Sequence, residues 1–240
     1  MKLIKYLFVM IFSIVLIVVL GIQALYFYKV SELDLEKVLV ASEYPQGALD
    51  ALWVSLGEST EQKIYPIGAL EYSFKLATLV SSSDISSYKQ VFAPGYLLSS
   101  HVAKSFVVGK TDGNTDWHLS NIMSSIWVSN NYTAEEALNY QLEKLYFGYN
   151  KFGLESAATF YFGKAPSDLN EMELVTLIAI TKGPSIFSPY CSPVRLEEWG
   201  REITKGLKIY EPNKYKLSTY KVPDSFIENG IKCHLTNASK

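Results

Sequence analysis

The stretch Tyr146–Lys164 reads Tyr-Phe-Gly-Tyr-Asn-Lys-Phe-Gly-Leu-Glu-Ser-Ala-Ala-Thr-Phe-Tyr-Phe-Gly-Lys. Gly148 and Gly153 permit backbone turns that a Cβ atom would hinder. The pair Ala157-Ala158 lets one helix approach another closely, and Tyr161 can then pack in the core. These residues predict a turn followed by a tightly packed helix. They are evidence for architecture rather than for chemistry.

Helical patterns continue on both sides of this stretch. Upstream, Thr133-Ala134-Glu135-Glu136 has the form of a capping box at the start of a helix. Downstream, Pro166-Ser167-Asp168 predicts the start of another helix, which ends near Lys182-Gly183-Pro184. A further helix is expected from about Pro193 to Ile209. Because few segments alternate with the period of a strand, the sequence predicts a mainly α fold.

Four motifs in this region resemble the C-terminal lobe of the family 51 peptidoglycan glycosyltransferases. They are a YFG turn at 146–148, a G-[IL]-x-x-A-A-x-x-Y-F-G-K helix at Gly153–Lys164, an L-x-x-x-E helix with Leu169 and Glu173, and a P-S-x-[YF]-x-P loop at Pro184–Pro189. All four occur in the family's order and at its spacing. The resemblance implies a lysozyme-like, mainly α domain at the outer face of the cytoplasmic membrane. There the family, which includes the glycosyltransferase domain of penicillin-binding proteins, polymerises lipid-linked disaccharide-pentapeptide into glycan strands.

Glycosyl transfer from a lipid pyrophosphate needs a base for the acceptor hydroxyl and positive charge near the leaving group. The family carries its second glutamate in a K-x-x-I-L-E-x-Y-L-N helix. In this chain Asn139 occupies the glutamate position and Ala134 the lysine position. An amide takes up no proton at neutral pH. We interpret the neighbouring Glu135, Glu136 and Glu143 as solvated helix charges or caps rather than substitutes.

The family's first glutamate follows an apolar helix, for which Ala51–Ser55 is the match. This register places Leu56 at the glutamate position and Gly57 at the adjacent aspartate position. Glu58, two residues further on, is the nearby candidate for the base, with a surface carboxylate as the alternative interpretation. Residues 60–92 contain almost nothing that resembles the family.

Two further family segments, G-G-S-T-I-T-Q-Q and R-K-x-x-E, align with residues 94–104 and 117–121. Trp117 and His118 stand where arginine and lysine belong, and Asn121 stands where glutamate belongs. The resemblance therefore implies that the pyrophosphate clamp is lost. The candidates for lining the cleft are Gly95, Ser99, Ser100, His101, Lys104 and His118. A histidine can act as a base at neutral pH, although polar surface or partly buried histidines are the alternative.

The N-terminal segment Tyr6–Tyr28 is uncharged and provides the roughly 20 apolar residues that a spanning helix needs. Lys2 and Lys5 precede it and acidic residues follow it, so we expect residues 1–5 in the cytoplasm and the rest of the chain outside. A cleaved signal peptide is the alternative, but the apolar run exceeds the usual stretch of about 7–15 residues. The residues Ser31–Asp34 are expected to cap a juxtamembrane helix.

The expected domains beyond the spanning helix are a glycosyltransferase-51-like domain at 31–210 and an irregular extension at 211–240. The two cysteines, Cys191 and Cys233, form either one disulfide or two buried free thiols, and both alternatives stay open. The chain carries 22 basic and 24 acidic side chains, for a net charge of -2. Because they are spread along the chain, no basic face for nucleic acid is expected.

These observations lead to the hypothesis of a catalytically degenerate, glycosyltransferase-like pseudoenzyme, anchored in the bacterial cytoplasmic (inner) membrane. The expected partners are membrane lipid, lipid-linked peptidoglycan precursor or a glycan strand, and cell-wall synthesis proteins. No cofactor is expected, and a divalent metal is implied only with a bound lipid pyrophosphate. Two enzymatic alternatives remain. One is a divergent active glycosyltransferase with Glu58 or a histidine as base, and the other is a lysozyme-like glycan-cleaving enzyme with one glutamate as general acid.

Overall fold

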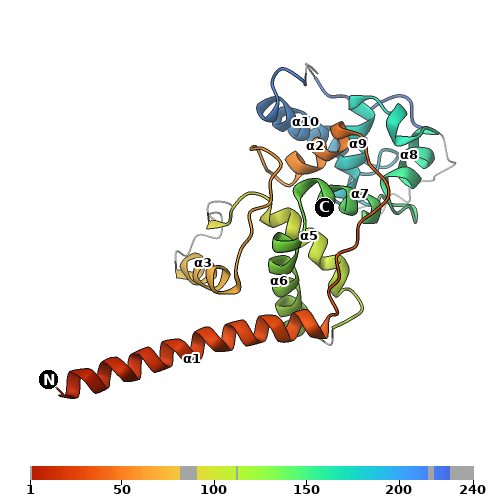
Figure 1. Ribbon diagram of the computed structural model, residues 1–240. Coiled ribbons are helices and arrows are strands. Elements are labelled where there is room, and N and C mark those ends of the chain that lie inside the picture. The colour runs from red at the N-terminus through yellow and green to blue at the C-terminus, as the bar shows by residue number, and fades with distance from the viewer. Residues whose placement is uncertain (1, 82–90, 112, 216–218, 228–240) are drawn as a thin grey trace, which may run out of the picture. The chain divides into compact units, whose positions relative to one another are not determined.

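The computed structural model describes residues 2–81, 91–111, 113–215 and 219–227 (Figure 1). The predicted mainly α class is confirmed, because helices account for the regular secondary structure of the described residues apart from one isolated bridge. The chain divides into two compact units. The first comprises Met1–Lys37 and Lys63–Thr133, and the second comprises Val38–Gln62 and Ala134–Lys240.

Helix α1 (Lys2–Glu32) is the N-terminal helix of the first unit. Its segment Ile4–Glu32 is long and apolar enough to cross a membrane. At about 1.5 Å per residue its 29 residues extend for roughly 43 Å, more than the hydrocarbon core of a bilayer requires. Figure 1 shows α1 as one uninterrupted helix that meets the rest of its unit near its C-terminal end.

The prediction that Ser31–Asp34 caps a juxtamembrane helix is wrong. Ser31 lies inside the last turn of α1, and the residues from Leu35 to Pro45 form no helix. Helix α1 continues through Ser31 because Lys29 pairs with Glu32 on the same face, while the Leu33 N–H donates to the Lys29 carbonyl at 3.0 Å.

The end of α1 is fixed to the first unit by two polar contacts. The buried ammonium of Lys29 forms an ion pair with Asp116 at the start of α6 (Asn114–Asn131). Lys110 donates from its Nζ to the Leu33 carbonyl at 2.8 Å. Both contacts act on the last turn of α1, so the helix end and the residues that bind it form one body.

The core of the first unit is built by α3 (Ala69–Ser81), α5 (Tyr96–Val107) and α6. Helices α5 and α6 lie against one another, and α1 and α3 pack on α6. In the core of this unit the rings of Phe92 and Tyr96 stack, and the Tyr72 ring packs against both at a tilt. Gly95 precedes α5 with a φ of 82°, and a Cβ there would lie 2.6 Å from the Lys63 carbonyl oxygen.

The second unit contains α2 (Gln46–Ser55), α7 (Ala134–Lys144), α8 (Leu154–Phe162), α9 (Glu171–Thr181) and α10 (Pro193–Tyr210). Its central helix is α2, which contacts α7, α9 and α10 and is buried from Ala48 to Val54.

One carboxylate, that of Asp50, lies in this buried run of α2 and is fully buried. It accepts hydrogen bonds from Gln46 and Gln62 at 2.8 Å, from Lys214 at 2.6 Å and from the Tyr215 hydroxyl. A buried charge is tolerated when it is paired and hydrogen-bonded in this way. The Asp50 contacts therefore attach the segment after α10 to α2.

The predicted helix start at Pro166-Ser167-Asp168 is wrong. These residues form a short 3₁₀ helix, and α9 begins at Glu171. Asn170 is the cap: its side chain accepts from the Glu173 N–H at 3.0 Å, and the Glu173 carboxylate accepts from the Asn170 N–H at 3.0 Å. This reciprocal capping box satisfies two helix-end donors at once, which the proline start could not do.

The segment after α10 is non-helical where the structure describes it, yet it is attached to the second unit. Tyr215 and Tyr220 are buried, and the Tyr220 hydroxyl lies 2.6 Å from that of Thr176. Cys191 is disulfide-bonded. Cys233 lies outside the described residues, as do residues 216–218 and 228–240 of the predicted extension.

Candidate functional site

The turn before α8 brings the end of α7 and the start of α8 together. Gly148 and Gly153 have φ values of 87° and 81°, in the left-handed region that favours glycine. A Cβ on Gly153 would lie 2.9 Å from the Glu143 carbonyl oxygen. On either side of Gly148, Tyr146 and Phe152 form an isolated antiparallel bridge.

The residues of the family-like helix have structural contacts. Ala157 and Ala158 are fully buried, and the Tyr161 hydroxyl donates to the Phe147 carbonyl at 2.6 Å. Lys164 donates to both carboxylate oxygens of Glu173, at 2.7 and 2.9 Å.

The Glu173 carboxylate is fully buried and also accepts from Asn170 and Ser225. Burial raises its pKa, but the hydrogen bonds from Lys164, Asn170 and Ser225 outweigh burial and hold the pKa below its ordinary value. Glu173 is therefore a charged residue that joins three segments of the second unit.

Asn139 lies on α7 with only 7% of its surface exposed. Its side-chain oxygen accepts from the Tyr44 N–H at 2.9 Å, and its amide nitrogen donates to the Glu135 carbonyl at 3.1 Å. Both ends of the amide are thus bonded to backbone. The Tyr44 contact holds the extended segment before α2 against α7.

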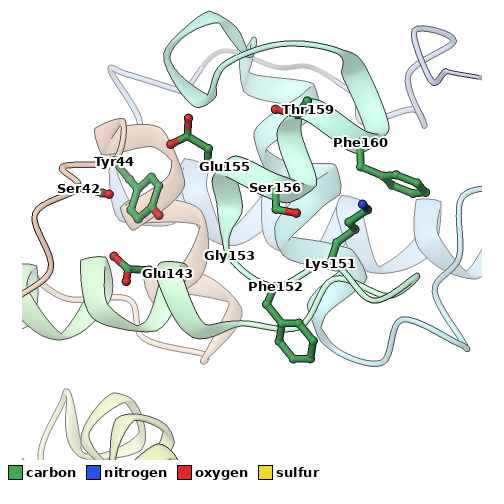
Figure 2. A pocket seen from close by; sticks show the side chains of 10 residues that line it. All are labelled: Ser42, Tyr44, Glu143, Lys151, Phe152, Gly153, Glu155, Ser156, Thr159 and Phe160. Atoms are coloured by element: carbon green, nitrogen blue, oxygen red, sulfur yellow. The ribbon is translucent and has the colours of Figure 1, made fainter.

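A hollow of about 640 Å³ opens one helical turn beyond Asn139, around Glu143 (Figure 2). Three segments form it: the extended chain before α2, the end of α7, and the first two turns of α8 with the loop before them. Its lining consists of Ser42, Tyr44, Glu143, Lys151, Phe152, Gly153, Glu155, Ser156, Thr159 and Phe160. Aromatic rings, hydroxyl groups and two carboxylates therefore face one space.

The two carboxylates of the hollow lie on either side of one phenol. Figure 2 shows the Tyr44 ring between the side chains of Glu143 on α7 and Glu155 on α8. Burial raises the pKa of Tyr44, the negative charges of Glu143 and Glu155 raise it further, and a hydrogen bond with Ser42 opposes them. The phenol therefore keeps its proton at neutral pH and can donate a hydrogen bond to a ligand.

A second hollow of about 620 Å³ adjoins the first. Ser42, Tyr44 and Glu155 line both, so the two form one groove along the segment before α2. The sequence did not predict this groove. Glu143 was interpreted as a solvated charge, and no motif marks Ser42 or Tyr44, which approach α8 only in the folded chain.

The residues predicted for the catalytic site do not line this groove. Glu58 follows the end of α2, is half-buried, and donates from its backbone N–H to the Trp53 carbonyl at 3.4 Å. Glu58 and Asn139 both belong to the second unit, and neither lines either hollow. Their proposed catalytic positions stay predictions.

The candidates for lining the cleft belong to the first unit. Gly95 and four side chains of α5 lie at its start and along its length, and His118 lies on α6. Ser99 donates to the Gly95 carbonyl at 3.1 Å, and Asn121 donates to Ser100 at 3.4 Å. Several polar atoms in this region are bonded within the helices themselves.

His101 is a partly buried histidine on α5. Burial, followed by the positive charge of Lys104, lowers the pKa of His101 to about 4. The imidazole is therefore neutral at pH 7 and has a low affinity for a proton. This makes His101 a weak general base at neutral pH.

The described residues contain no cluster of side chains that could bind a metal ion. No three side chains of His, Cys, Asp or Glu gather there in a way that could hold an ion. A divalent metal stays a conditional prediction, tied to a bound lipid pyrophosphate.

Comparison with known proteins shows which family part of this chain is similar to. Residues 98–208 match the family model described as Transglycosylase. The resemblance to the family 51 peptidoglycan glycosyltransferases is confirmed over this segment. The transglycosylase segment, as we call residues 98–208, includes α6 to α9 and the turn with Gly148 and Gly153. Its fold class is the mainly α, lysozyme-like one that the sequence predicts. Gly95 and Glu58 precede it.

The relatives of the transglycosylase segment are penicillin-binding proteins. Penicillin-binding protein 2D of Bacillus subtilis is 23% identical over 160 residues, 67% of this chain and 22% of the relative. Penicillin-binding protein 1F of the same organism is 34% identical over 77 residues, 32% of this chain and 11% of the relative. Penicillin-binding protein 1A of Escherichia coli is 38% identical over 60 residues, 25% and 7% of the two chains. The chain thus spans about a fifth or less of these relatives.

Proposed function

We propose that this protein is a membrane-anchored, catalytically degenerate relative of the peptidoglycan glycosyltransferases that binds glycan or lipid-linked precursor without polymerising it. The observation that carries the proposal is the environment of Asn139. At the position of the second family glutamate stands an amide whose oxygen and nitrogen are both engaged with backbone groups. A residue in this state can neither take a proton nor reach a substrate hydroxyl.

The groove supports the binding half of the proposal. Sugar rings offer apolar faces and many hydroxyl groups, and the groove offers the exposed ring of Phe152 together with Tyr44, Glu143 and Glu155. The aromatic faces can stack on a pyranose while the carboxylates accept from its hydroxyls. The proposed ligand is a short stretch of peptidoglycan glycan, free or lipid-linked.

The test uses the full-length protein, purified in detergent. With lipid II as substrate we expect no polymer on a gel under conditions in which an active penicillin-binding protein 1A produces it. Polymer formation that disappears in Glu58→Gln would overturn the degenerate assignment and favour the divergent active transferase.

Binding is measured separately by titration with purified disaccharide-peptide fragments of peptidoglycan. We expect Phe152→Ala to weaken binding by at least fivefold. Phe74→Ala is the matched control, because Phe74 is also an exposed ring but lies on α3 of the first unit. Equal affinity of the Phe152→Ala and Phe74→Ala variants would contradict the placement of the ligand in the groove.

A second candidate function rests on the two carboxylates that flank Tyr44. Glycan cleavage needs a carboxyl pair across one binding site, and the groove holds Glu143 and Glu155. Incubation of the protein with purified sacculi, followed by chromatography of released fragments, tests this. Release that is lost in both Glu143→Gln and Glu155→Gln would favour the lysozyme-like enzyme, and no release would remove it.

The proposed location is the cytoplasmic membrane, with residues 1–5 inside and the chain beyond α1 outside. Lys2 and Lys5 at the N-terminal end of α1 support this orientation, as do Asp34 and Glu36, which follow the helix. Protease added to intact spheroplasts should digest the chain beyond α1 while an N-terminal tag stays protected. Protection of the C-terminal part would reverse the orientation.

A further inference from the structure

The first unit contains an apolar groove between the C-terminal half of α1 and helices α3 and α6. It has a volume of about 590 Å³, within the usual range for ligand pockets. Helix α1 contributes Ile22 and Leu25, α3 contributes Leu76 and Val80 among others, and α6 contributes residues 119, 122 and 123. None of the described side chains that line it is charged.

The depth of this groove follows from the geometry of α1. Counting from Tyr6, where the uncharged run begins, Leu25 lies 19 residues further along the helix, or about 28 Å. The hydrocarbon core of a bilayer is about 30 Å thick. If α1 spans the membrane, as the proposed function requires, the groove opens at the outer edge of the hydrocarbon core.

The contacts of Lys29 keep the groove at this depth. Lys29 is buried and paired with Asp116 of α6, so α6 cannot swing away from the last turn of α1. Helix α3 contacts both α1 and α6. The three walls of the groove therefore move together with the membrane helix.

The exposed surface of α3 fits a place at the membrane boundary. Phe74 is 72% exposed and Val80 is 75% exposed, which is unusual for large apolar side chains in water. The two charged residues of α3, Glu71 and Lys75, pair with each other at 3.2 Å. Large apolar side chains such as Phe74 and Val80 can lie at the boundary between headgroups and acyl chains.

We propose that this groove holds one acyl chain of a phospholipid from the outer leaflet, and that α3 lies in the membrane interface. The lining favours an acyl chain over the lipid-linked precursor, because a pyrophosphate needs positive charge and the described lining offers none. The bound chain fills the space between α1 and α3 and excludes water from it. This inference rests on the membrane anchor of the proposed function but not on its glycan-binding groove.

The test uses full-length protein in vesicles of phosphatidylethanolamine and phosphatidylglycerol at a ratio of 3:1. A small fraction of the phospholipid carries a photoactivatable diazirine near the end of one acyl chain. After illumination, mass spectrometry of the digested protein locates the lipid adducts. We expect adducts on the peptides with Leu76–Ser81 and Leu119–Met123.

Two tryptophan variants separate groove occupancy from general contact with the bilayer. Ala77→Trp fills the groove and should lower those adducts by at least fivefold. Thr78→Trp, at the next position on α3 and outside the groove lining, should leave them unchanged. Equal adducts in both variants, or adducts confined to the bilayer-facing part of α1, would overturn the proposal.

Two further measurements identify the kind of lipid that is bound and show whether a negative result comes from the groove or from the membrane anchor. Undecaprenyl phosphate added at a few mole per cent should not displace the adducts, and displacement would overturn the assignment to a phospholipid chain. Flotation of the vesicles on a density gradient tests the anchor itself. Protein that floats with the vesicles but lacks groove adducts would contradict this inference alone, whereas protein that does not float would contradict the proposed membrane anchor.

Discussion

The side-chain oxygen of Asn139 accepts a hydrogen bond from the backbone N–H of Tyr44 at 2.9 Å, across 95 residues of sequence. The contact joins the position predicted for the family's second glutamate to a wall of the groove. We expect Asn139→Ala to lower the free energy of unfolding by about 1–3 kcal/mol, since it leaves the Tyr44 N–H without its partner. Urea denaturation followed by circular dichroism measures the change. Asn139→Asp keeps the acceptor oxygen and should recover most of the loss. A fully stable alanine variant would show that the contact is dispensable.

The Lys164–Glu173 ion pair should make the free energy of unfolding depend on pH in the acidic range. Because the folded-state pKa of Glu173 is held below its ordinary value of 4.5, its contribution is present above about pH 4.5. That contribution is lost as the pH falls through the lower folded-state value. Lys164→Met should lower the free energy of unfolding at pH 7 by about 2 kcal/mol. This is less than a fully buried pair would lose, because Lys164 is 37% exposed.

The dependence of stability on pH shows whether Lys164 stabilises the protein through its charge or through the packing of its side chain. In Lys164→Met the buried carboxylate lacks its cation, so its pKa should rise and the loss of stability below pH 4.5 should shrink or reverse. Unfolding measured from pH 3 to pH 7 for both proteins decides this. Parallel profiles would show that Lys164 contributes through its methylene chain instead.

Gly153→Ala should destabilise the second unit through both strain and collision. Gly153 and Gly109 both have positive φ values, 81° and 77°, so an alanine at either site introduces backbone strain, of about 1–3 kcal/mol. Only at Gly153 would the new Cβ meet a backbone atom, the Glu143 carbonyl oxygen at 2.9 Å. Gly109, with open space around it, is the matched control. We expect a lower melting temperature for Gly153→Ala than for Gly109→Ala, and equal values would mean that the turn adjusts freely.

His101 should titrate well below the ordinary histidine value of 6.5. Nuclear magnetic resonance of the three imidazoles is expected to give a midpoint near pH 4 for His101. The unfolded chain binds this proton near pH 6.5, so His101 favours folding above that pH. This contribution declines as the pH falls from about 6.5 towards 4. His101→Gln should remove this part of the pH dependence. A midpoint near 6.5 would show that the side chain is hydrated, and would restore it as a candidate base.

The sequence predicts local structure correctly where a residue type is compatible with only one kind of backbone or packing environment. The positive φ at Gly148 and Gly153 and the burial of Ala157 and Ala158 follow from residues that allow few alternatives. The start of α9 was missed although the signal was present, because Asn170 and Glu173 form a capping box that competes with the proline at 166. A proline permits a helix start, whereas a capping box also satisfies its donors.

The groove could not be predicted, because it depends on contacts between distant segments. Glu143 and Glu155 are separated by the turn that the glycines make, and Tyr44 reaches them from a segment with no regular structure. Sequence pattern shows which face of a helix is apolar but not which extended segment will cross it. The same limit applies to Lys29, whose partner Asp116 lies 87 residues away.

The pairing of Lys29 with Asp116 changes how the first unit can search for anything it binds. A domain that is attached to a membrane helix by a flexible linker can take many positions and orientations above the bilayer. The distance that it can reach grows with the length of the linker. A helix end that is locked to the domain keeps the domain at one height and at one tilt. If α1 spans the membrane, as proposed, the first unit meets its partners by lateral diffusion in two dimensions. Molecules carried by the same membrane come within its reach, and molecules that remain far above the surface do not.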